Sequence, residues 1–316
     1  MDSARAVTRA IADFAAVHLR GVTRVCVGLS GGPDSLALTA GSVRAGLSVT
    51  ALVVDHGLQL GSADVADAAA DEARGLGADA MVLPVTVGVD GGLEAAARAA
   101  RYAALDAARG GAPVLLGHTM DDQAETVLLG LGRGSGARSI AGMRAWSAPW
   151  GRPLLGVRRS TTLALCTELG LAPHTDPHNR DPRFTRVRLR GEVLPLLEDV
   201  LKGGVAESLS RTASALQADN DALDGYAEEL AGRAATDTGL AVALLADAPD
   251  AVRTRVIRRW LLGVGATEPT ARVIGAVDEL VMRWRGQGGV AIGGDGAVRL
   301  EVARVGEVIG VERTPR

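Results

Sequence analysis

The sequence predicts an α/β protein: a parallel sheet with helices on both faces, followed by a smaller second domain of helices and β-hairpins. From residue 22 to residue 132, short β-branched runs alternate with longer helical patterns, which is typical of strand–helix units in series. At 316 residues the chain is longer than one hydrophobic core usually supports. The pattern also changes after Gly132, where a second region begins.

The N-terminal segment, residues 1–20, has apolar positions at helical spacing but carries Asp2 and Asp13, so we expect a packed amphipathic helix rather than a leader peptide. Four predicted strand–helix units follow: 22–29 with 35–46, 48–55 with 62–77, 78–85 with 92–110, and 112–117 with 121–132. No apolar run approaches the roughly 18 residues of a membrane span. We therefore expect a cytoplasmic protein with no membrane contact.

The second half of the chain gives weaker patterns. The predicted elements are a Gly- and Arg-rich loop over 133–146, a strand or extended piece leading into a helix over 152–170, a loop from 176 to a helix near Val187, a polar helix over 205–230, short helices over 240–285 and hairpins over 288–312. We find no internal repeat.

Polar clusters follow three of the predicted strands: Ser30–Ser35, Val54–Gly57 and Gly117–Asp122. The carboxyl ends of parallel strands meet at one edge of a sheet, where ligands of such folds bind. We therefore expect these clusters to form one site.

The first cluster, Ser-Gly-Gly-Pro-Asp-Ser, predicts an anion site. Its glycines let backbone amides approach a ligand, and the helix that starts near Pro33 directs its positive end to the same place. Beside a polyphosphate, Asp34 needs a hard cation such as Mg²⁺ between the two negative groups. The GK[ST] of a P-loop and the GxGxxG of a dinucleotide site are absent. A plain turn in which Asp34 and Ser35 cap the helix is the alternative.

Charge is segregated along the chain, although the net charge is only −3. Residues 129–190 hold 11 Arg against 3 acidic residues, whereas the segments on either side are net acidic. This basic stretch predicts polyanion binding, and a chance fluctuation is the alternative. Cys26 and Cys166 are isolated in apolar surroundings, so we expect buried thiols and no disulfide or metal site.

Seven segments together resemble one family. In order they read SGGPDS, VDHGL (54–58), GLEAAARAARY (92–102), GHTMDDQAETVLLGLGRGSG (117–136), AGM (141–143), RPLL (152–155) and DPHNRDPRFTRVRLRGEVLPLL (176–197). The first resembles the PP-loop of ATP pyrophosphatases, which have an adenine nucleotide α-hydrolase-like fold. The whole set, covering most of residues 22–197, resembles the short form of bacterial tRNA(Ile)-lysidine synthetases.

The resemblance implies a ligase that joins L-lysine to the wobble cytidine of a CAU-anticodon isoleucine tRNA, through an adenylated cytidine, with release of AMP and pyrophosphate. It implies ATP and Mg²⁺ as cofactors and three parts: a catalytic domain over 1–205, a linker helix over 206–230 and a tRNA-contacting domain over 231–316. The oligomeric state is left open, with a homodimer as one option. A PP-loop tRNA cytidine thiolase and a non-catalytic ATP-binding regulatory protein are the alternatives.

The expected site residues follow from the motifs. The ATP-binding residues are Ser30, Gly31, Gly32, Pro33, Asp34, Ser35, His56 and Arg101, with Asp34 also on the metal; the catalytic residues are Asp34, His118, Asp121 and Glu125. Asp121 and Glu125, four residues apart on one helix face, would hold the lysine ammonium, and His118 would relay its proton. Helix capping at Thr119 and Asp122, and a solvated face for Arg101, are the alternatives.

Arginines of the basic stretch are expected to contact tRNA phosphates: Arg133, Arg138, Arg183, Arg186, Arg188 and Arg190, together with Arg144, Arg152, Arg158 and Arg159. Phe184, Trp146 and Trp150 are candidates for stacking on the reacting base, or for the core. Arg253, Arg255, Arg258 and Arg259 form either a basic patch for the acceptor stem or an ion-paired face. Val187 replaces an Asn usual in the family, and His178 stands where Ser or Thr is common.

Overall fold

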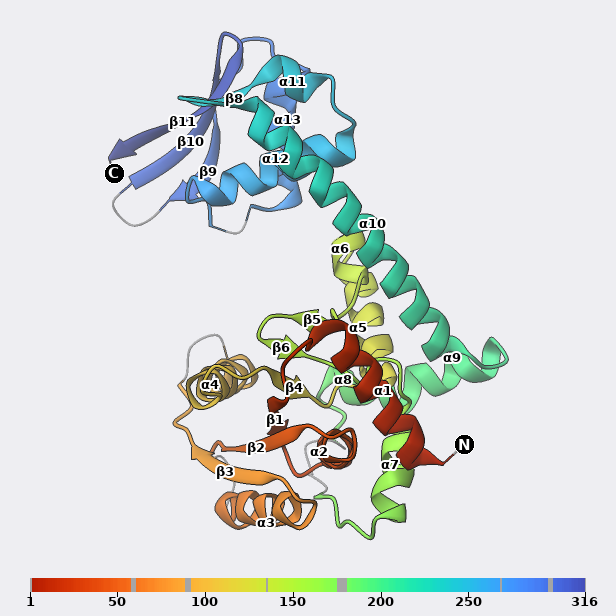
Figure 1. Ribbon diagram of the computed structural model, residues 1–316. Coiled ribbons are helices and arrows are strands. Elements are labelled where there is room, and N and C mark those ends of the chain that lie inside the picture. The colour runs from red at the N-terminus through yellow and green to blue at the C-terminus, as the bar shows by residue number, and fades with distance from the viewer. Residues whose placement is uncertain are drawn as a thin grey trace. The chain divides into compact units, whose positions relative to one another are not determined.

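The computed structural model describes residues 2–57, 61–88, 92–134, 136–174, 181–267, 269–294 and 298–315. The chain forms two compact units, Met1–Ser214 and Ala215–Arg316 (Figure 1). His178 lies outside the described residues.

The first unit alternates strands and helices in the predicted order. Its elements are α1 (Ser3–His18), β1 (Arg24–Leu29), α2 (Pro33–Arg44), β2 (Ser48–Asp55), α3 (Ser62–Gly75), β3 (Asp79–Pro84), α4 (Leu93–Ala108), β4 (Val114–Leu116), α5 (Met120–Gly132), α6 (Ala137–Ile140), β5 (Trp146–Ser147), β6 (Trp150–Gly151), α7 (Arg159–Glu168), α8 (Thr185–Arg188), a π-helical turn (Leu189–Val193) and α9 (Leu194–Val200). The long helix α10 (Val205–Ala234) begins in this unit and covers the predicted linker helix.

The strands of this unit form one sheet in the order β3-β2-β1-β4-β6-β5. Strands β1 to β4 and β6 are parallel, and β5 pairs antiparallel with β6. From β1 the chain moves to β2 on one side and later returns to β4 on the other. The loops after β1 and β4 therefore meet at the topological switch point, where such sheets bind ligands.

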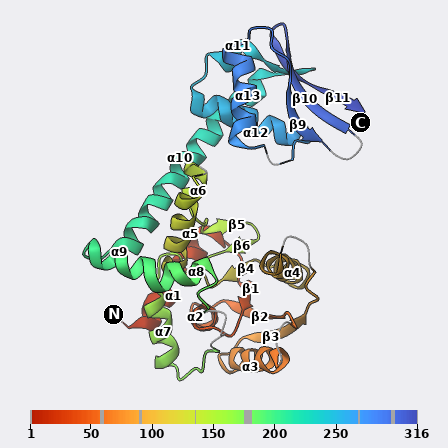
Figure 2. The ribbon, with the colours of Figure 1, turned by 180° about the vertical axis from the view of Figure 1, so that it is seen from behind.

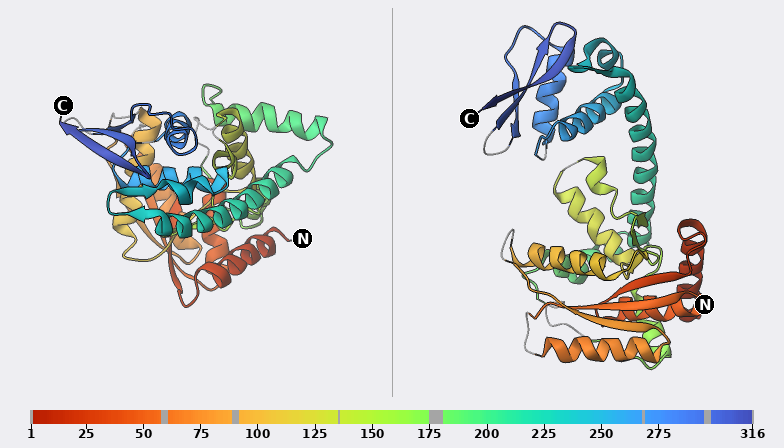
Figure 3. Two further views of the ribbon diagram at one scale, coloured as in Figure 1. Left: turned by 90° about the horizontal axis from the view of Figure 1, so that it is seen from above. Right: turned by 60° about the vertical axis from the view of Figure 1, so that its left-hand side comes forward.

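Helices cover both faces of the sheet (right-hand view of Figure 3). Val25, Val27 and Leu29 of β1 pack into a core shared with α1, α2, α3 and α7. Cys26 of the same strand faces the other way and packs with Leu105 of α4. Burial on both faces explains why β1 is a nearly continuous apolar run, as is usual for a parallel strand.

One prediction for residues 133–197 needs correction, whereas the helix predicted near Val187 is present. The predicted strand or extended piece near Arg152 forms turns, and the strands β5 and β6 lie before it, in and after the predicted loop. The helix predicted near Val187 begins at Thr185 and passes through a π-helical turn into α9. Helix α9 and the start of α10 pack against α5 through Leu194, Val205 and Ala124 (Figure 2).

The second unit confirms the predicted small domain of helices and hairpins. Its elements after α10 are β7 (Ala235–Thr236), β8 (Gly239–Ala241), α11 (Val242–Ala246), α12 (Asp250–Gly263), α13 (Ala271–Met282), β9 (Val290–Gly294), β10 (Val298–Val305) and β11 (Val308–Pro315). The strands form an antiparallel sheet in the order β7-β8-β11-β10-β9. Ile257, Leu280 and Val302 lie in a core that α12, α13 and the sheet share.

Among the described residues, no helix is both long enough and apolar enough to span a bilayer.

Candidate active site

The loop Ser30–Ser35 joins β1 to α2 and is closed by its own hydroxyls. Ser35 Oγ accepts from the Ser30 amide at 3.1 Å and donates to the Gly32 carbonyl at 2.9 Å. Gly31 has a φ of 76°, in the left-handed region that favours glycine. Pro33 begins α2, whose first amides have no partner within the helix. The loop therefore offers backbone donors and a positive helix end, which fits the predicted anion site.

The loop after β4 approaches this turn so closely that a side chain at position 117 would be crowded. A Cβ on Gly117 would lie 3.0 Å from the C and O atoms of Asp34 and from the N atom of Ser35. These are backbone atoms and cannot rotate aside. Gly117 thus brings the start of α5 next to Asp34.

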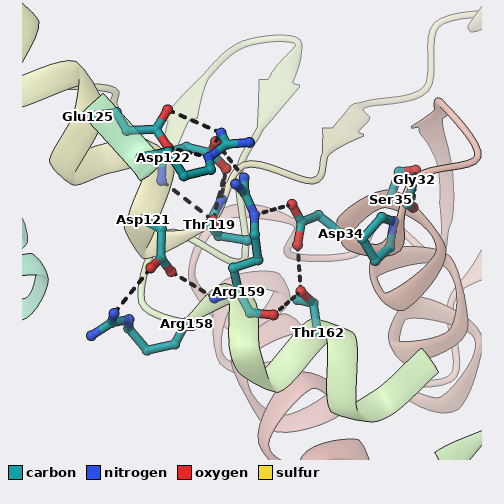
Figure 4. A network of polar contacts seen from close by, with 12 residues as sticks. Gly32, Asp34, Ser35, Thr119, Asp121, Asp122, Glu125, Arg158, Arg159 and Thr162 are labelled. Carbon is teal, nitrogen blue, oxygen red and sulfur yellow. Dashed lines mark hydrogen bonds and ion pairs between the residues drawn. The ribbon is translucent and has the colours of Figure 1, made fainter. Parts of the chain in front are cut away.

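The Asp34 carboxylate is held by α7 (Figure 4). Arg159 Nε donates to Asp34 Oδ2 at 2.9 Å, and Thr162 Oγ1 donates to Oδ1. Burial raises the pKa of Asp34, and Arg159 and Thr162 partly offset this. The expectation for Arg159 was an RNA phosphate contact, but the structure places its guanidinium between buried acids.

Helix α5 presents two acids on one face, Asp122 and Glu125. Arg190 Nε lies 2.7 Å from Glu125 Oε1, and Arg190 Nη2 lies 3.2 Å from Asp122 Oδ1. Arg159 Nη2 reaches the same Asp122 oxygen at 2.7 Å (Figure 4). The Glu125 side chain has 0% exposure, and burial raises its pKa although Arg190 lowers it. For Asp122 the burial effect is outweighed by Arg159 and the Thr119 amide, so its pKa is lowered.

The neighbouring acid, Asp121, has different partners. Its Oδ2 accepts from the Arg159 backbone amide at 2.7 Å, and Arg158 Nη2 lies 3.2 Å from Oδ1. Arg158 also pairs with Glu207 of α10 at 2.8 Å. We expected Asp121 and Glu125 to face the same ligand; the structure instead brings Asp122 together with Glu125 and ties Asp121 to the starts of α7 and α10.

His118 and the predicted nucleotide residues His56 and Arg101 carry buried nitrogen atoms that make no hydrogen bond to any described residue. These atoms are Nδ1 of His118, Nδ1 of His56 and Nε of Arg101; Nη1 of Arg159 is a fourth. Burial lowers the pKa of His118, and with the smaller contributions of Arg152, Arg101 and Arg98, which Asp122 opposes, the pKa is about 4. Buried donors beside a cluster of arginines fit an anionic ligand such as a triphosphate.

The side chains of the site also fit a magnesium ion that binds together with a phosphate group. Among the described residues no group of three or more His, Cys, Asp and Glu side chains is arranged to bind a metal. Mg²⁺ typically takes one or two carboxylates and completes its shell with phosphate oxygens and water. Asp34, next to the loop amides, can supply that carboxylate.

Six of the ten arginines predicted to contact tRNA differ in how they are placed. Arg133, Arg138, Arg183 and Arg188 are exposed, the last two in ion pairs with Asp181 and Glu192. Arg186 is also exposed but turns toward the buried Glu125, with Nη1 at 3.8 Å from its Oε2, and Arg190 bonds the same acid. A hollow of about 290 Å³ is lined by Arg183, Arg188, Thr185 and three apolar residues, Pro182, Leu189 and Val193.

The aromatic candidates also separate. Trp146 packs beside Phe14, with ring centres 6.1 Å apart, and Trp150 packs edge-on against Tyr102 at 4.7 Å. Both belong to packed clusters, as the alternative reading predicts. Phe184 is 36% exposed.

In the second unit the predicted basic patch on α12 is largely an ion-paired face. Arg253 is 3% exposed and bonds Asp278 and Asp250 at 2.6 Å each, and Arg255 pairs with Asp224. Arg258 and Arg259 of the same helix are exposed, and Arg259 pairs with Glu228 at 2.7 Å. Further exposed basic side chains lie after α13, at Arg283 and Arg285.

Sequence reasoning missed Asp122, Arg159 and Thr162 as site residues. Asp122 was assigned to helix capping, which it does perform: its Oδ2 accepts from the Thr119 amide at 2.8 Å. Its other oxygen is the one that faces Arg159 and Arg190. The sequence did contain one signal for these residues: two consecutive acids, 121–122, and two consecutive arginines, 158–159. Because neighbouring residues of a helix point in different directions, the two members of each pair contact different partners.

Comparison with known proteins first concerns the fold. A U34-tRNA thiolase from Methanococcus maripaludis matches with a TM-score of 0.54 at 19% sequence identity, covering 67% of this chain and 78% of that one. At this identity the likeness shows the fold alone. It confirms the predicted PP-loop architecture.

Sequence comparison identifies the family. A model described as a PP-loop domain matches residues 2–197, and one described as a TilS substrate binding domain matches residues 240–305. The tRNA(Ile)-lysidine synthase of Nocardia farcinica is 62% identical over 93% of this chain and 94% of its own length. That of Mycobacterium tuberculosis (strain H37Rv) is 63% identical over 92% of this chain and 91% of its own length. This chain therefore belongs to the tRNA(Ile)-lysidine synthase family.

Proposed function

We propose that this protein catalyses the ATP-dependent joining of L-lysine to the wobble cytidine of a CAU-anticodon isoleucine tRNA, releasing AMP and pyrophosphate. It is a ligase that forms a C–N bond and acts in the cytoplasm, where its tRNA is found. One observation carries the proposal: an anion site, the loop Ser30–Ser35, lies beside a cation site, Asp122 and Glu125. The reaction requires this combination, since it brings a triphosphate and a protonated amine together.

In the first step the cytosine O2 attacks the α-phosphorus of ATP, and the bond to the β-phosphate oxygen breaks. The loop amides, the start of α2 and the unpaired nitrogen atoms of Arg101 and His118 support nucleotide binding here. A Mg²⁺ ion on Asp34 and the phosphates would offset the charge that develops on the departing pyrophosphate.

In the second step the lysine ε-amine attacks C2 of the base, and the bond from C2 to the adenylate oxygen breaks. Asp122 and Glu125 pair with the guanidinium groups of Arg159 and Arg190, which supports a role in binding a cation; the lysine ammonium is the cation they would bind. The ammonium must lose a proton before it attacks. His118 is neutral above a pH of about 4 and can accept a proton once bound phosphates raise its pKa.

For tRNA binding we propose two surfaces. The first holds the exposed arginines Arg133, Arg138, Arg183 and Arg188 and the exposed Phe184. The second lies in the 215–316 unit, where Trp284 is 42% exposed between the exposed Arg283 and Arg285. The Arg304 guanidinium lies 4.9 Å from the centre of the Trp284 ring. An aromatic ring among arginines is the usual platform for an unpaired base.

The two alternatives fit less well. A thiolase needs cysteines or a cluster for sulfur, whereas Cys26 and Cys166 are buried, and burial raises the pKa of both, that of Cys166 to about 11. A regulatory ATP-binding protein would have no need for a buried acid pair beside the loop.

The test is incubation of a CAU-anticodon isoleucine tRNA transcript with ATP, Mg²⁺ and labelled lysine. Label in the RNA together with pyrophosphate release is expected. Absence of both refutes the proposal; sulfur transfer that is lost in the C26S/C166S variant would favour the thiolase, and ATP binding without AMP formation the regulatory protein. Sedimentation of the same sample would decide whether a homodimer forms.

A further inference from the structure

Arg159 joins two acids that come from different loops of the site. Its Nε lies 2.9 Å from Asp34 Oδ2 and its Nη2 lies 2.7 Å from Asp122 Oδ1 (Figure 4). The three side chains are 18%, 18% and 14% exposed, respectively. Removing the guanidinium would leave two poorly solvated carboxylates facing each other, which is costly.

The guanidinium also competes with any metal for Asp34. Both oxygens of this carboxylate already accept a hydrogen bond, one from Arg159 and the other from Thr162. Each oxygen keeps a second lone pair to which a metal ion could bind, but a cation bound there would lie close to the guanidinium of Arg159. Arg159 is the donor that carries charge, and its positive charge repels an incoming cation.

A third nitrogen of the same guanidinium is unused. Arg159 Nη1 is buried and makes no hydrogen bond to a described residue, whereas Nε and Nη2 both bond carboxylates. A planar guanidinium presents its donors in a fixed fork that suits carboxylate and phosphate alike. When the metal binds Asp34, a phosphate oxygen that enters with it would give Arg159 Nη1 an acceptor.

We propose that Arg159 is an internal counter-ion: it occupies the place of the divalent cation between Asp34 and Asp122, and gives up Asp34 when the metal–nucleotide complex binds. The inference rests on the proposed function for the identity of the nucleotide. Arg159 acts through Asp34 and is therefore a positioning residue. Its presence makes metal binding depend on nucleotide, since Mg²⁺ alone must compete with a charge that is already in place.

The test uses Mg²⁺ without nucleotide or tRNA, so it is independent of catalysis. We expect Arg159→Met to lower the melting temperature and about 10 mM Mg²⁺ to restore roughly 3–6 °C, while the wild type gains less than about 1 °C. Thr162→Val is the matched control, because it removes the other donor to Asp34 but leaves the guanidinium. It should gain no more than the wild type.

The double variant D34N/R159M should lose the Mg²⁺ effect. The proposal is overturned if R159M gains no more from Mg²⁺ than T162V, or if the double variant gains as much as R159M. Should R159M not fold, Arg159→Gln supplies the second measurement: calorimetric binding of a non-cleavable ATP analogue against Mg²⁺ concentration. Glutamine keeps a hydrogen-bond donor but removes the charge that repels the metal, so the Mg²⁺ midpoint should fall several-fold; an unchanged or higher midpoint also overturns the proposal. If the wild-type protein showed no ligase activity, that result would count against the proposed function but would not affect the Mg²⁺ measurements.

Discussion

Arg190 and Glu125 lie 65 residues apart in the chain, yet the Nε of one is 2.7 Å from the Oε1 of the other. The pair places a cation on a carboxylate that has no exposed surface. A buried acid that already pairs with a cation is suited to exchange that partner for the ammonium of an amino acid. The exchange is possible because Asp122, on the same helix face, shares the guanidinium of Arg190.

The first prediction separates the two neighbouring aspartates. Asp122→Asn should raise the KM for lysine by roughly 10- to 100-fold, the usual cost of a charged hydrogen bond. Asp121→Asn is the control, since Asp121 bonds the Arg159 backbone and Arg158. It should lower the melting temperature with little change in KM. Steady-state kinetics with labelled lysine measure both, and an equal rise in KM for the two variants would contradict the assignment.

The second prediction concerns the contact between loops at Gly117. Gly117→Ala would force a methyl group against the backbone of Asp34 and Ser35, so nucleotide affinity should fall about 10-fold or more while the fold survives. Gly132→Ala is the matched control, because a Cβ at Gly132 meets nothing within 4 Å. Calorimetry with a non-cleavable ATP analogue gives the affinities. Equal affinities for the two variants would show that the loop spacing is not critical.

The third prediction is a pH dependence of stability that arises from His118. The pKa of His118 is about 4 in the folded protein and about 6.5 when unfolded, so the unfolded state binds more protons between these values. The free energy of unfolding should therefore fall by up to about 3 kcal/mol as the pH drops from 6.5 to 4. In His118→Asn this part of the decline should disappear. Urea unfolding at several pH values tests it, and parallel curves for the two proteins would refute it.

The fourth prediction concerns the 215–316 unit. Trp284→Ala should weaken tRNA binding by about 5- to 100-fold if one base stacks on the ring. Tyr226→Ala is the control, because Tyr226 of α10 is also an exposed aromatic residue, at 62%. It should leave the affinity within about 2-fold, the scale of an ordinary surface change. Filter binding with the isoleucine tRNA transcript measures both, and similar affinities for the variants would remove Trp284 from the binding surface.

The parts of the fold that could be predicted are those with a strong local pattern. Strand β1 is a short β-branched run and α2 begins at Pro33, so the loop between them was located from the sequence. Strands β5 and β6 have two residues each and show no alternation, so they were not found. Their pairing depends on β4, which supplies the neighbouring edge.

The candidate site was predicted where its residues are close in sequence. His118 and Glu125 lie in one motif, whereas Arg159 and Thr162 are 125 and 128 residues from the Asp34 they contact. The periodicity of apolar residues gives no information on contacts between residues so far apart in the sequence. Charge counts likewise could not tell which arginines of 129–190 remain at the surface, because that depends on which acids the fold buries beside them.

The two consecutive acids of α5 and the two consecutive arginines at the start of α7 also require a particular rotation of α7 about its axis relative to α5. Neighbouring residues of a helix diverge by about 100°, so Asp121 with Arg158 and Asp122 with Arg159 form two pairs that point in different directions. Inserting one residue ahead of Arg158 would preserve every charge in the protein but would move Arg158 into the place of Arg159, opposite Asp122, and Arg159 into the place of Ser160. The number of residues between β6 and α7 is therefore as tightly constrained as the residue types of the two pairs.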